Sequence, residues 1–255
     1  MNKELLQKIT SRKEYSQLPR KEVELAFQKF DKEKYSDEEK VKLTRKLLRE
    51  VFSSFTSPKL LSLKDKNPEW ILRKHFSTRE RLPYSEEVYS KLLGGLNKNL
   101  SVIDLGAGIN GFSYEIFKKI GYNVNYLAVE AMGQLVELMN FYFDKQKVSA
   151  NAVQESLFEL EKIKDILKKQ KKPRVVFLFK VIDSLEMLEK DYSKEFLLGI
   201  GEFAERIVVS FAVKSMGNRI RFRANRDWIL DFIKENFKII EDFEIGGERY
   251  LVFSK

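Results

Sequence analysis

Three glycines and one aspartate gather in a short segment of this chain. Between Ser101 and Phe112 the sequence reads S-V-I-D-L-G-A-G-I-N-G-F, an apolar run that leads into glycines at positions 106, 108 and 111. Glycine permits positive φ and lets a ligand approach the backbone where a Cβ would block it. The amphipathic segment that follows would offer free N–H groups and a partial positive charge at a helix start. The pattern therefore predicts a nucleotide-type ligand site.

The ligand at this turn is indicated by two carboxylates. The G-x-G-x-x-G spacing alone suggests a dinucleotide. Asp104, two residues before the first glycine, would repel a pyrophosphate but could meet the ammonium end of S-adenosylmethionine (SAM), directly or through water. Glu130 ends the next apolar run, where an acid suits the ribose hydroxyls of either SAM or NAD. We expect SAM, with NAD and a ligand-free turn as the alternatives.

The charge is distributed unevenly along the chain. Of the net charge of +9 on 255 residues, +7 lies in residues 1–74, which hold 19 Lys and Arg against 12 Asp and Glu. A basic module attached to a nearly neutral domain favours a polyanionic partner. A solvated basic surface is the alternative. The length suits one large α/β domain with a smaller appendage.

Several classes of protein are disfavoured by composition. The chain has no cysteine and one histidine, which excludes disulfides and thiolate nucleophiles and argues against a metal site. No apolar run approaches the roughly 20 residues of a membrane span, and the N-terminus lacks the apolar core of a signal peptide. We expect a cytoplasmic monomer that binds neither a metal ion nor a membrane.

Residues 1 to about 70 read as helices. Ser36-Asp37-Glu38-Glu39 is a capping-box start for a helix whose apolar face would pack inward. The opposite face would be basic, and its candidate RNA-binding residues are Lys40, Arg45, Lys46 and Arg49. We expect a basic helical docking module at 1–74 and a second domain at 75–255.

The second domain alternates strands and helices. Strands are expected near 101–106, 125–130, 148–153, 174–180 and 206–212, and helices near 111–120, 132–144, 156–170 and 193–203. Such alternation predicts a parallel sheet. Residues 237–254 read as a hairpin around Gly246-Gly247. We therefore expect a class I SAM-dependent methyltransferase fold, an α/β fold with a seven-stranded, mostly parallel sheet, an antiparallel terminal hairpin and an N-terminal helical module.

The absence of two chemical features narrows the methyl acceptor. Methylation of pyrimidine C5 requires a cysteine, and methylation of an exocyclic amine commonly uses an [DNS]-P-P-[YFW] motif after the fourth strand. Here that position reads F-K-V-I-D-S at 179–184, without proline. A ring nitrogen such as guanine N7 already has an in-plane lone pair and requires positioning but no base.

Five segments resemble the 16S ribosomal RNA (guanine-N7) methyltransferases that confer aminoglycoside resistance. They are H-F-S-T-R-E-R-L at 75–82, D-L-G-A-G-I-N at 104–110, F-L-F-K-V-I-D-S-L-E at 177–186, V-V-S-F-A-V-K-S-M-G-N-R at 208–219 and F-E-I-G-G-E-R-Y-L-V at 243–252. The chain departs from the family pattern at Ala107, Gly111, Val181, Asp183 and Ala212, where the family has cysteine, proline, threonine, proline and proline. The resemblance implies methylation of a guanine N7 in the decoding region of 16S rRNA within the assembled small subunit, with S-adenosylhomocysteine as the product.

The resemblance also implies roles for individual residues. Arg81 would reach the SAM carboxylate, and Lys180 would stand at the mouth of the active site as the candidate catalytic residue. The candidate cofactor-binding residues are Arg81, Asp104, Gly106, Ala107, Gly108, Glu130, Ala131, Glu155, Ser156, Leu157 and Phe179. The loop after the fifth strand would hold RNA through Lys214, Ser215, Arg219, Arg221 and Arg223. The alternatives are a SAM methyltransferase acting on another base, another RNA or a small molecule, and an inactive rRNA-binding relative.

Overall fold

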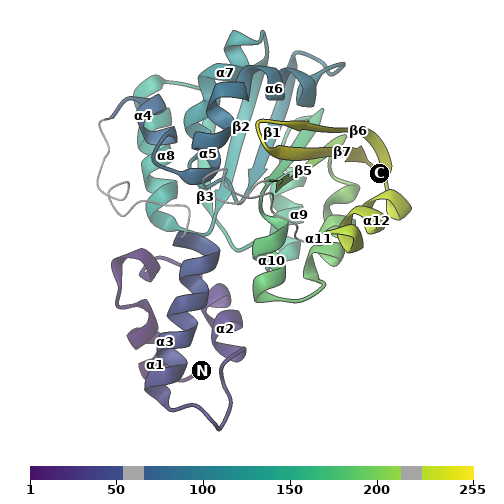
Figure 1. Cartoon of the computed structure of the whole chain (residues 1–255). Helices are drawn as coiled ribbons and strands as arrows, with labels where there is room; N and C mark the ends of the chain where they lie inside the picture. Colours follow the sequence, from purple (N-terminus) through teal and green to yellow (C-terminus); the bar gives the residue numbers. More distant parts are fainter. Residues whose placement is uncertain (54–65, 214–225) are drawn as a thin grey trace.

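A seven-stranded sheet forms the centre of the computed structural model, which describes residues 1–53, 66–213 and 226–255 (Figure 1). The strand order is β3-β2-β1-β4-β5-β7-β6. The strands are β1 (Asn99–Leu105), β2 (Asn123–Glu130), β3 (Ala150–Gln154), β4 (Arg174–Phe179), β5 (Arg206–Ala212), β6 (Lys238–Ile245) and β7 (Glu248–Ser254).

The first five strands are parallel and the last two are antiparallel. β1, β4 and β5 are almost wholly buried, as expected of apolar strands covered on both faces. β7 inserts between β5 and β6, and Gly246 and Gly247 turn the hairpin with φ of +64° and +79°. The predicted parallel sheet with an antiparallel terminal hairpin is confirmed.

Helices cover both faces of the sheet. The α-helices described in residues 66–213 and 226–255 are α4 (Pro68–Leu72), α5 (Phe76–Arg81), α6 (Ser85–Leu93), α7 (Tyr114–Lys119), α8 (Gly133–Gln146), α9 (Leu160–Lys168), α10 (Ile182–Leu188), α11 (Tyr192–Gly201) and α12 (Asp227–Asn236). Successive residues of β4 point to opposite sides, so Phe177 packs among residues of α6, α7 and α8, whereas Leu178 packs among residues of α9 to α12.

Some helix predictions were incomplete. The helix expected over 111–120 starts as a 3₁₀ turn at Asn110–Ser113 before α7, and the helix expected over 156–170 is the shorter α9. α10 and α12 were not predicted. α10 has only two turns, so its apolar periodicity is too short to be recognised in the sequence.

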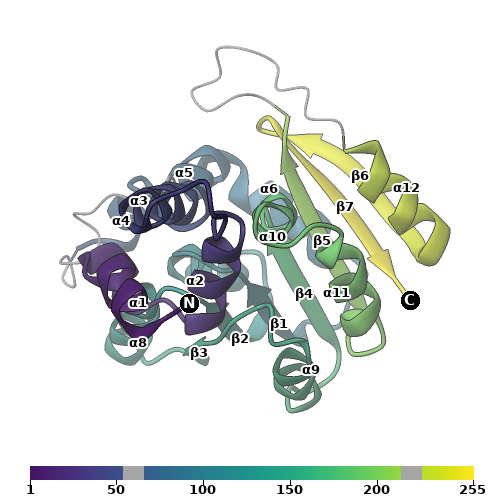
Figure 2. The same ribbon diagram turned by 90° about the horizontal axis from the view of Figure 1, so that it is seen from below.

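The N-terminal helices lie beyond the carboxyl ends of β1 and β2, at the bottom of Figure 1 and facing the viewer in Figure 2. They are α1 (Lys3–Thr10), α2 (Arg20–Gln28) and α3 (Asp37–Leu48), and α3 continues as a π-helical turn over Arg49–Ser53. The predicted capping box of Ser36 and Glu39 is present. One hydrophobic cluster contains Phe27, Leu48 and sheet residues such as Val102, so these helices pack with the larger domain. The boundary at residue 74 stays a prediction.

Within the described ranges, no helix is both long and apolar enough to span a membrane. The same ranges contain no group of three or more histidine, aspartate or glutamate side chains placed to hold a metal ion.

Candidate functional site

A cavity opens where the strand order reverses between β1 and β4. In doubly wound sheets the carboxyl ends of the strands leave a ligand crevice at this point. The cavity and its open mouth together hold about 930 Å³ of space that no protein atom fills. The candidate catalytic residue Lys180 lines it, and so do nine of the candidate cofactor-binding residues: Arg81, Asp104, Gly106, Ala107, Gly108, Glu130, Ala131, Leu157 and Phe179.

The glycine turn has a different physical basis at each glycine. Gly106 and Gly108 have φ of +72° and +55°, which side chains rarely adopt. A Cβ on Gly106 would lie 2.7 Å from a methyl carbon of Val181, and one on Gly108 would lie 3.2 Å from His75 Nε2. Gly111 lacks a positive φ, but a Cβ there would lie 2.6 Å from Phe143. The neighbours of all three glycines are therefore protein side chains, and Gly111 serves packing against α8.

Asp104 is buried and held by two hydrogen bonds. Its Oδ2 accepts from Asn110 Nδ2 and from the Tyr126 hydroxyl, both at 2.7 Å. Burial raises the pKa of Asp104, and the two hydrogen bonds and the charge of Arg81 act against that rise. Asn110 comes from the D-L-G-A-G-I-N motif and therefore fixes the aspartate from within the turn itself.

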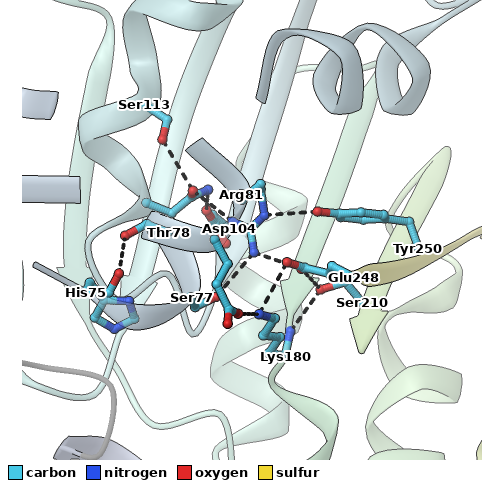
Figure 3. Close-up of polar contacts among 12 residues, drawn as sticks. His75, Ser77, Thr78, Arg81, Asp104, Ser113, Lys180, Ser210, Glu248 and Tyr250 are labelled. Carbon is cyan, nitrogen blue, oxygen red and sulfur yellow. Dashed lines mark hydrogen bonds and ion pairs between the residues drawn. The ribbon is translucent and has the colours of Figure 1, made fainter. Parts of the chain in front are cut away.

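Arg81 is buried in a network that joins three parts of the chain (Figure 3). Its guanidinium donates to Glu248 Oε1 at 2.9 Å, to Asn110 Oδ1 at 3.1 Å and to the Tyr250 hydroxyl at 3.3 Å. It also lies 4.1 Å from the centre of the Phe179 ring. Burial disfavours the charge, but the Glu248 carboxylate, Tyr250 and Tyr89 together oppose this effect, and the net result is a raised pKa of Arg81.

Lys180 continues the same network at the end of β4. Its Nζ lies 2.8 Å from Glu80 Oε2 and 3.5 Å from Glu248 Oε2, and its side chain is 11% exposed. Its backbone has φ of +60°, although it is not glycine. A residue other than glycine is strained at positive φ and keeps this conformation only when the surrounding structure holds it there. Such strained residues are concentrated at functional sites. Despite burial, the charges of Arg81 and Lys180 lower the pKa of Glu248.

Glu130 lines the cavity at the end of β2. Its Oε2 accepts from the Gly108 amide at 2.8 Å and its Oε1 from the Met132 amide at 3.0 Å. Burial raises its pKa, and these backbone hydrogen bonds oppose the rise. The acid expected to hold ribose hydroxyls therefore also ties the glycine turn to the start of α8.

The segment after β3 meets the prediction only in part. Leu157 lines the cavity together with Phe158, whereas Glu155 and Ser156 are not among its lining residues. Glu155 accepts from the Ser156 amide and pairs with Lys162, and the Ser156 hydroxyl accepts from the Phe158 amide. The apolar members of the segment form the wall because the polar ones are used to shape its turn.

Three lining residues come from the N-terminal helices. Glu22 of α2 and Val51 and Phe52 after α3 border the cavity. Glu22 is 1% exposed, and its Oε2 has no hydrogen-bond partner among the described residues. No sequence motif indicated this residue, because its neighbours at the cavity are distant in the chain.

The basic face of α3 is partly used inside the module. Arg45 donates to the carbonyls of Lys8 and Ile9 and to the Ser11 hydroxyl, which fastens α1 to α3. Lys40 pairs with Asp31 at 2.8 Å and is 16% exposed. Arg45 and Lys40 therefore also have partners inside the module. A groove between α1 and α3 is lined by six basic side chains, namely Lys8, Arg12, Lys42, Arg45, Lys46 and Arg49, and by two acidic ones.

The candidate RNA-binding residues Lys214, Ser215, Arg219, Arg221 and Arg223 lie outside the described residues. Arg226, which follows them, donates to Asp183 at 2.6 Å and to the Ala212 carbonyl at 2.8 Å. Two positions at which the chain departs from the family motifs are thus joined by one arginine.

Several network residues were missed although they stand inside the quoted motifs. Glu80 belongs to H-F-S-T-R-E-R-L, Asn110 to the glycine segment and Glu248 to G-G-E-R-Y. Their presence in these motifs was the available signal, because a polar side chain that becomes buried needs a hydrogen-bond partner. The pairing could not be read because it joins residues up to 169 positions apart.

The family model described as "Ribosomal RNA methyltransferase (FmrO)" matches residues 44–227. A 16S rRNA (guanine(1405)-N(7))-methyltransferase from Proteus mirabilis is 24% identical over 197 residues, which cover 72% of this chain and 64% of that protein. The chain thus matches somewhat less than two thirds of the length of this curated relative.

Solved structures share the fold. The 16S rRNA methyltransferase RmtF, in complex with S-adenosyl-L-homocysteine, covers the whole of both chains with a TM-score of 0.78 and 20% identity. An rRNA methylase from Escherichia coli gives a TM-score of 0.76 at 18% identity, over 99% of this chain and 98% of that one. At these identities the likeness establishes the fold. Since the family model spans well over half of the sequence, the chain belongs to the FmrO family of ribosomal RNA methyltransferases.

Proposed function

We propose that this protein transfers a methyl group from SAM to N7 of a guanine in the decoding region of 16S rRNA, within the assembled small ribosomal subunit. The curated relative and the RmtF structure carry names that describe this class of activity. Because its substrate would be the ribosome, we expect it to act in the cytoplasm, and protection from aminoglycosides is the expected consequence for the cell.

The set of charged groups that line the cavity is the observation that carries the proposal. The cations Arg81 and Lys180 and the carboxyl groups of Asp104 and Glu130 all line it. SAM has the complementary groups, with an amino-acid carboxylate, an ammonium group and ribose hydroxyls. The positive-φ glycines Gly106 and Gly108 and the apolar side chains of Leu157 and Phe158 line the same cavity. The residues present therefore fit this methyl donor.

Each polar wall would hold one part of the donor. Guanidinium N–H groups suit a carboxylate. The contacts of Arg81 with described residues use four of its five N–H donors, so the fifth would donate to the carboxylate of SAM. Asp104 would accept from the ammonium group, and Glu130 from the ribose. When bound, SAM supplies an electrophilic methyl group on its sulfonium.

The acceptor side requires orientation rather than proton transfer. The N7 lone pair of guanine accepts a methyl group without losing a proton, so no general base is needed. Lys180 stands between Glu80 and Glu248 at the end of β4 and would position the base at the cavity mouth. Displacing a base from rRNA costs a few kcal/mol, which docking through the basic groove of α1 and α3 would offset.

The test is methylation of isolated subunits. Purified protein with radiolabelled SAM should label small ribosomal subunits, and borohydride and aniline treatment followed by primer extension should map one N7-methylguanine in the decoding region. Large subunits and guanosine monophosphate serve as controls. Absence of label in every RNA would contradict the proposal, and label at another base would assign the protein to a different RNA substrate.

A further inference from the structure

Glu22 is a buried acid that the proposed transfer does not use. It lies in the middle of the N-terminal segment, on α2, yet it is 1% exposed and borders the cavity of the larger domain. Buried carboxyl oxygens are normally hydrogen-bonded, but Glu22 Oε2 has no partner among the described residues. An acceptor of this kind, placed on the wall of a ligand cavity, indicates a partner that the ligand supplies.

The surroundings of Glu22 indicate the chemistry of that partner. Glu130 and Glu155 both act on Glu22 as like charges, so this end of the cavity is rich in acceptors. Burial raises the pKa of Glu22 to about 7, and a hydrogen bond with Ser156 acts against that rise. Such a site repels anions and favours a neutral group that donates N–H or O–H hydrogens.

Two donor groups of the nucleoside remain to be distinguished. Glu130 comes from the end of β2, the position that suits ribose hydroxyls. Glu22 instead lies beside Ser156, in the segment whose next two residues, Leu157 and Phe158, supply apolar walls that suit the faces of a purine. The donor on the edge of an adenine ring is its exocyclic amine.

We propose that the Glu22 carboxyl group accepts a hydrogen bond from the adenine amine of the methyl donor, so that helix α2 forms part of the donor site. This inference rests on the proposed function. It also means that the module proposed to dock on rRNA contributes a wall of the donor pocket. Donor binding and the position of α2 are then linked, because the contact forms only when both are in place.

The experiment compares two ligands that differ at the amine. S-adenosylhomocysteine carries the amine, whereas S-inosylhomocysteine carries an oxygen acceptor there. By titration calorimetry at pH 8, where the Glu22 carboxyl group is mostly ionised, Glu22→Gln should weaken S-adenosylhomocysteine about tenfold, since a neutral amide oxygen replaces a charged acceptor. The same variant should bind S-inosylhomocysteine more tightly than the wild type does, because a glutamine amide can donate to the oxygen. Glu22→Met should weaken the first ligand further and give no gain with the second.

Glu24→Gln is the matched control, because Glu24 lies on the same helix but pairs with Arg20 at the surface. It should leave both affinities unchanged. Equal effects of Glu22→Gln on both ligands, or no effect on either, would overturn the inference while leaving the donor site intact. Failure of the wild type to bind S-adenosylhomocysteine would overturn the proposed function and the inference together. Melting curves of the ligand-free variants separate loss of binding from loss of folding.

Discussion

The cavity and the groove between α1 and α3 use their charged side chains in different ways. Around the cavity, Arg81 and Glu248 are each 3% exposed in their side chains and pair with one another. In the groove between α1 and α3, side chains such as Lys42 and Lys46 are exposed to solvent. Buried charges depend on their protein partners, whereas exposed charges remain available for another molecule.

The comparison teaches that residue type alone does not indicate a role. Arg45 and Lys46 are both candidate RNA-binding residues, yet Arg45 also fastens α1 to α3 through backbone carbonyls, whereas Lys46 is exposed. Substitutions in the cavity network should therefore act on stability and donor binding together. Substitutions at exposed positions of the groove should act on RNA binding alone.

The largest effect is expected from Arg81→Ala, which leaves Glu248 buried without its main partner. We expect a loss of about 3–5 kcal/mol in the free energy of unfolding, measured by urea denaturation, and loss of S-adenosylhomocysteine binding by calorimetry. Arg249→Ala removes a partly exposed pair with Asp242 on the same hairpin and should cost less than about 1 kcal/mol. Similar losses in the free energy of unfolding of the two variants would show that burial of an ion pair does not determine how much its removal costs.

Glu22 should make the ligand-free protein less stable as the pH rises. The folded carboxyl group has a pKa of about 7, against an ordinary value of 4.5 in the unfolded chain. The folded state binds more protons between these values, so the free energy of unfolding falls as pH rises from about 4.5 to 7, by roughly 3 kcal/mol at most. Its charged or titratable neighbours are Glu130, Glu155 and Tyr192.

Glu22→Gln removes this dependence, so its advantage in melting temperature over the wild type should be larger at pH 8 than at pH 5. A constant difference between wild type and variant across this range would refute the assignment. Glu22→Gln should thus raise the stability of the ligand-free protein and lower its affinity for the ligand. This combination is expected for a binding residue whose burial destabilises the fold.

Lys180 should show a smaller conflict between stability and function. Because its φ is +60°, Lys180→Gly should be about 1 kcal/mol more stable than Lys180→Ala, measured by thermal denaturation. Both variants should lose rRNA methylation. Lys147, with φ of +50° at the end of α8, is the control, because its glycine variant should gain stability over alanine without losing methylation. Methylation of rRNA by the Lys180 variants would show that this side chain does not position the base.

The smallest effect on the protein itself is expected from Lys46→Glu. This variant should fold and bind S-adenosylhomocysteine as the wild type does, but its affinity for small subunits should fall and depend less steeply on salt, with the slope reduced by about one. Lys171→Glu makes the same charge change at an exposed position before β4. Filter binding at several salt concentrations would measure both, and equal losses would mean that net charge, rather than the groove, determines docking.

Most of the fold could be predicted because its signals are local. Apolar runs followed by glycine or by polar turns located the five parallel strands, and Gly246-Gly247 located the hairpin. The short helix α10 escaped because two turns show too little periodicity. The glycine turn and the acids Asp104 and Glu130 were identified for the same local reason, since each stands at the end of a buried strand.

The sequence by itself therefore determined the sheet, the glycine turn and the two acids at the ends of its first two strands. Only the tertiary structure decided that Arg81 pairs with Glu248, that Arg45 binds backbone carbonyls of α1 and that Glu22 reaches the cavity from α2. These contacts join residues far apart in the chain. Periodicity and turn chemistry depend on neighbours a few positions away, whereas a buried pair depends on how whole elements pack, and no local pattern records that.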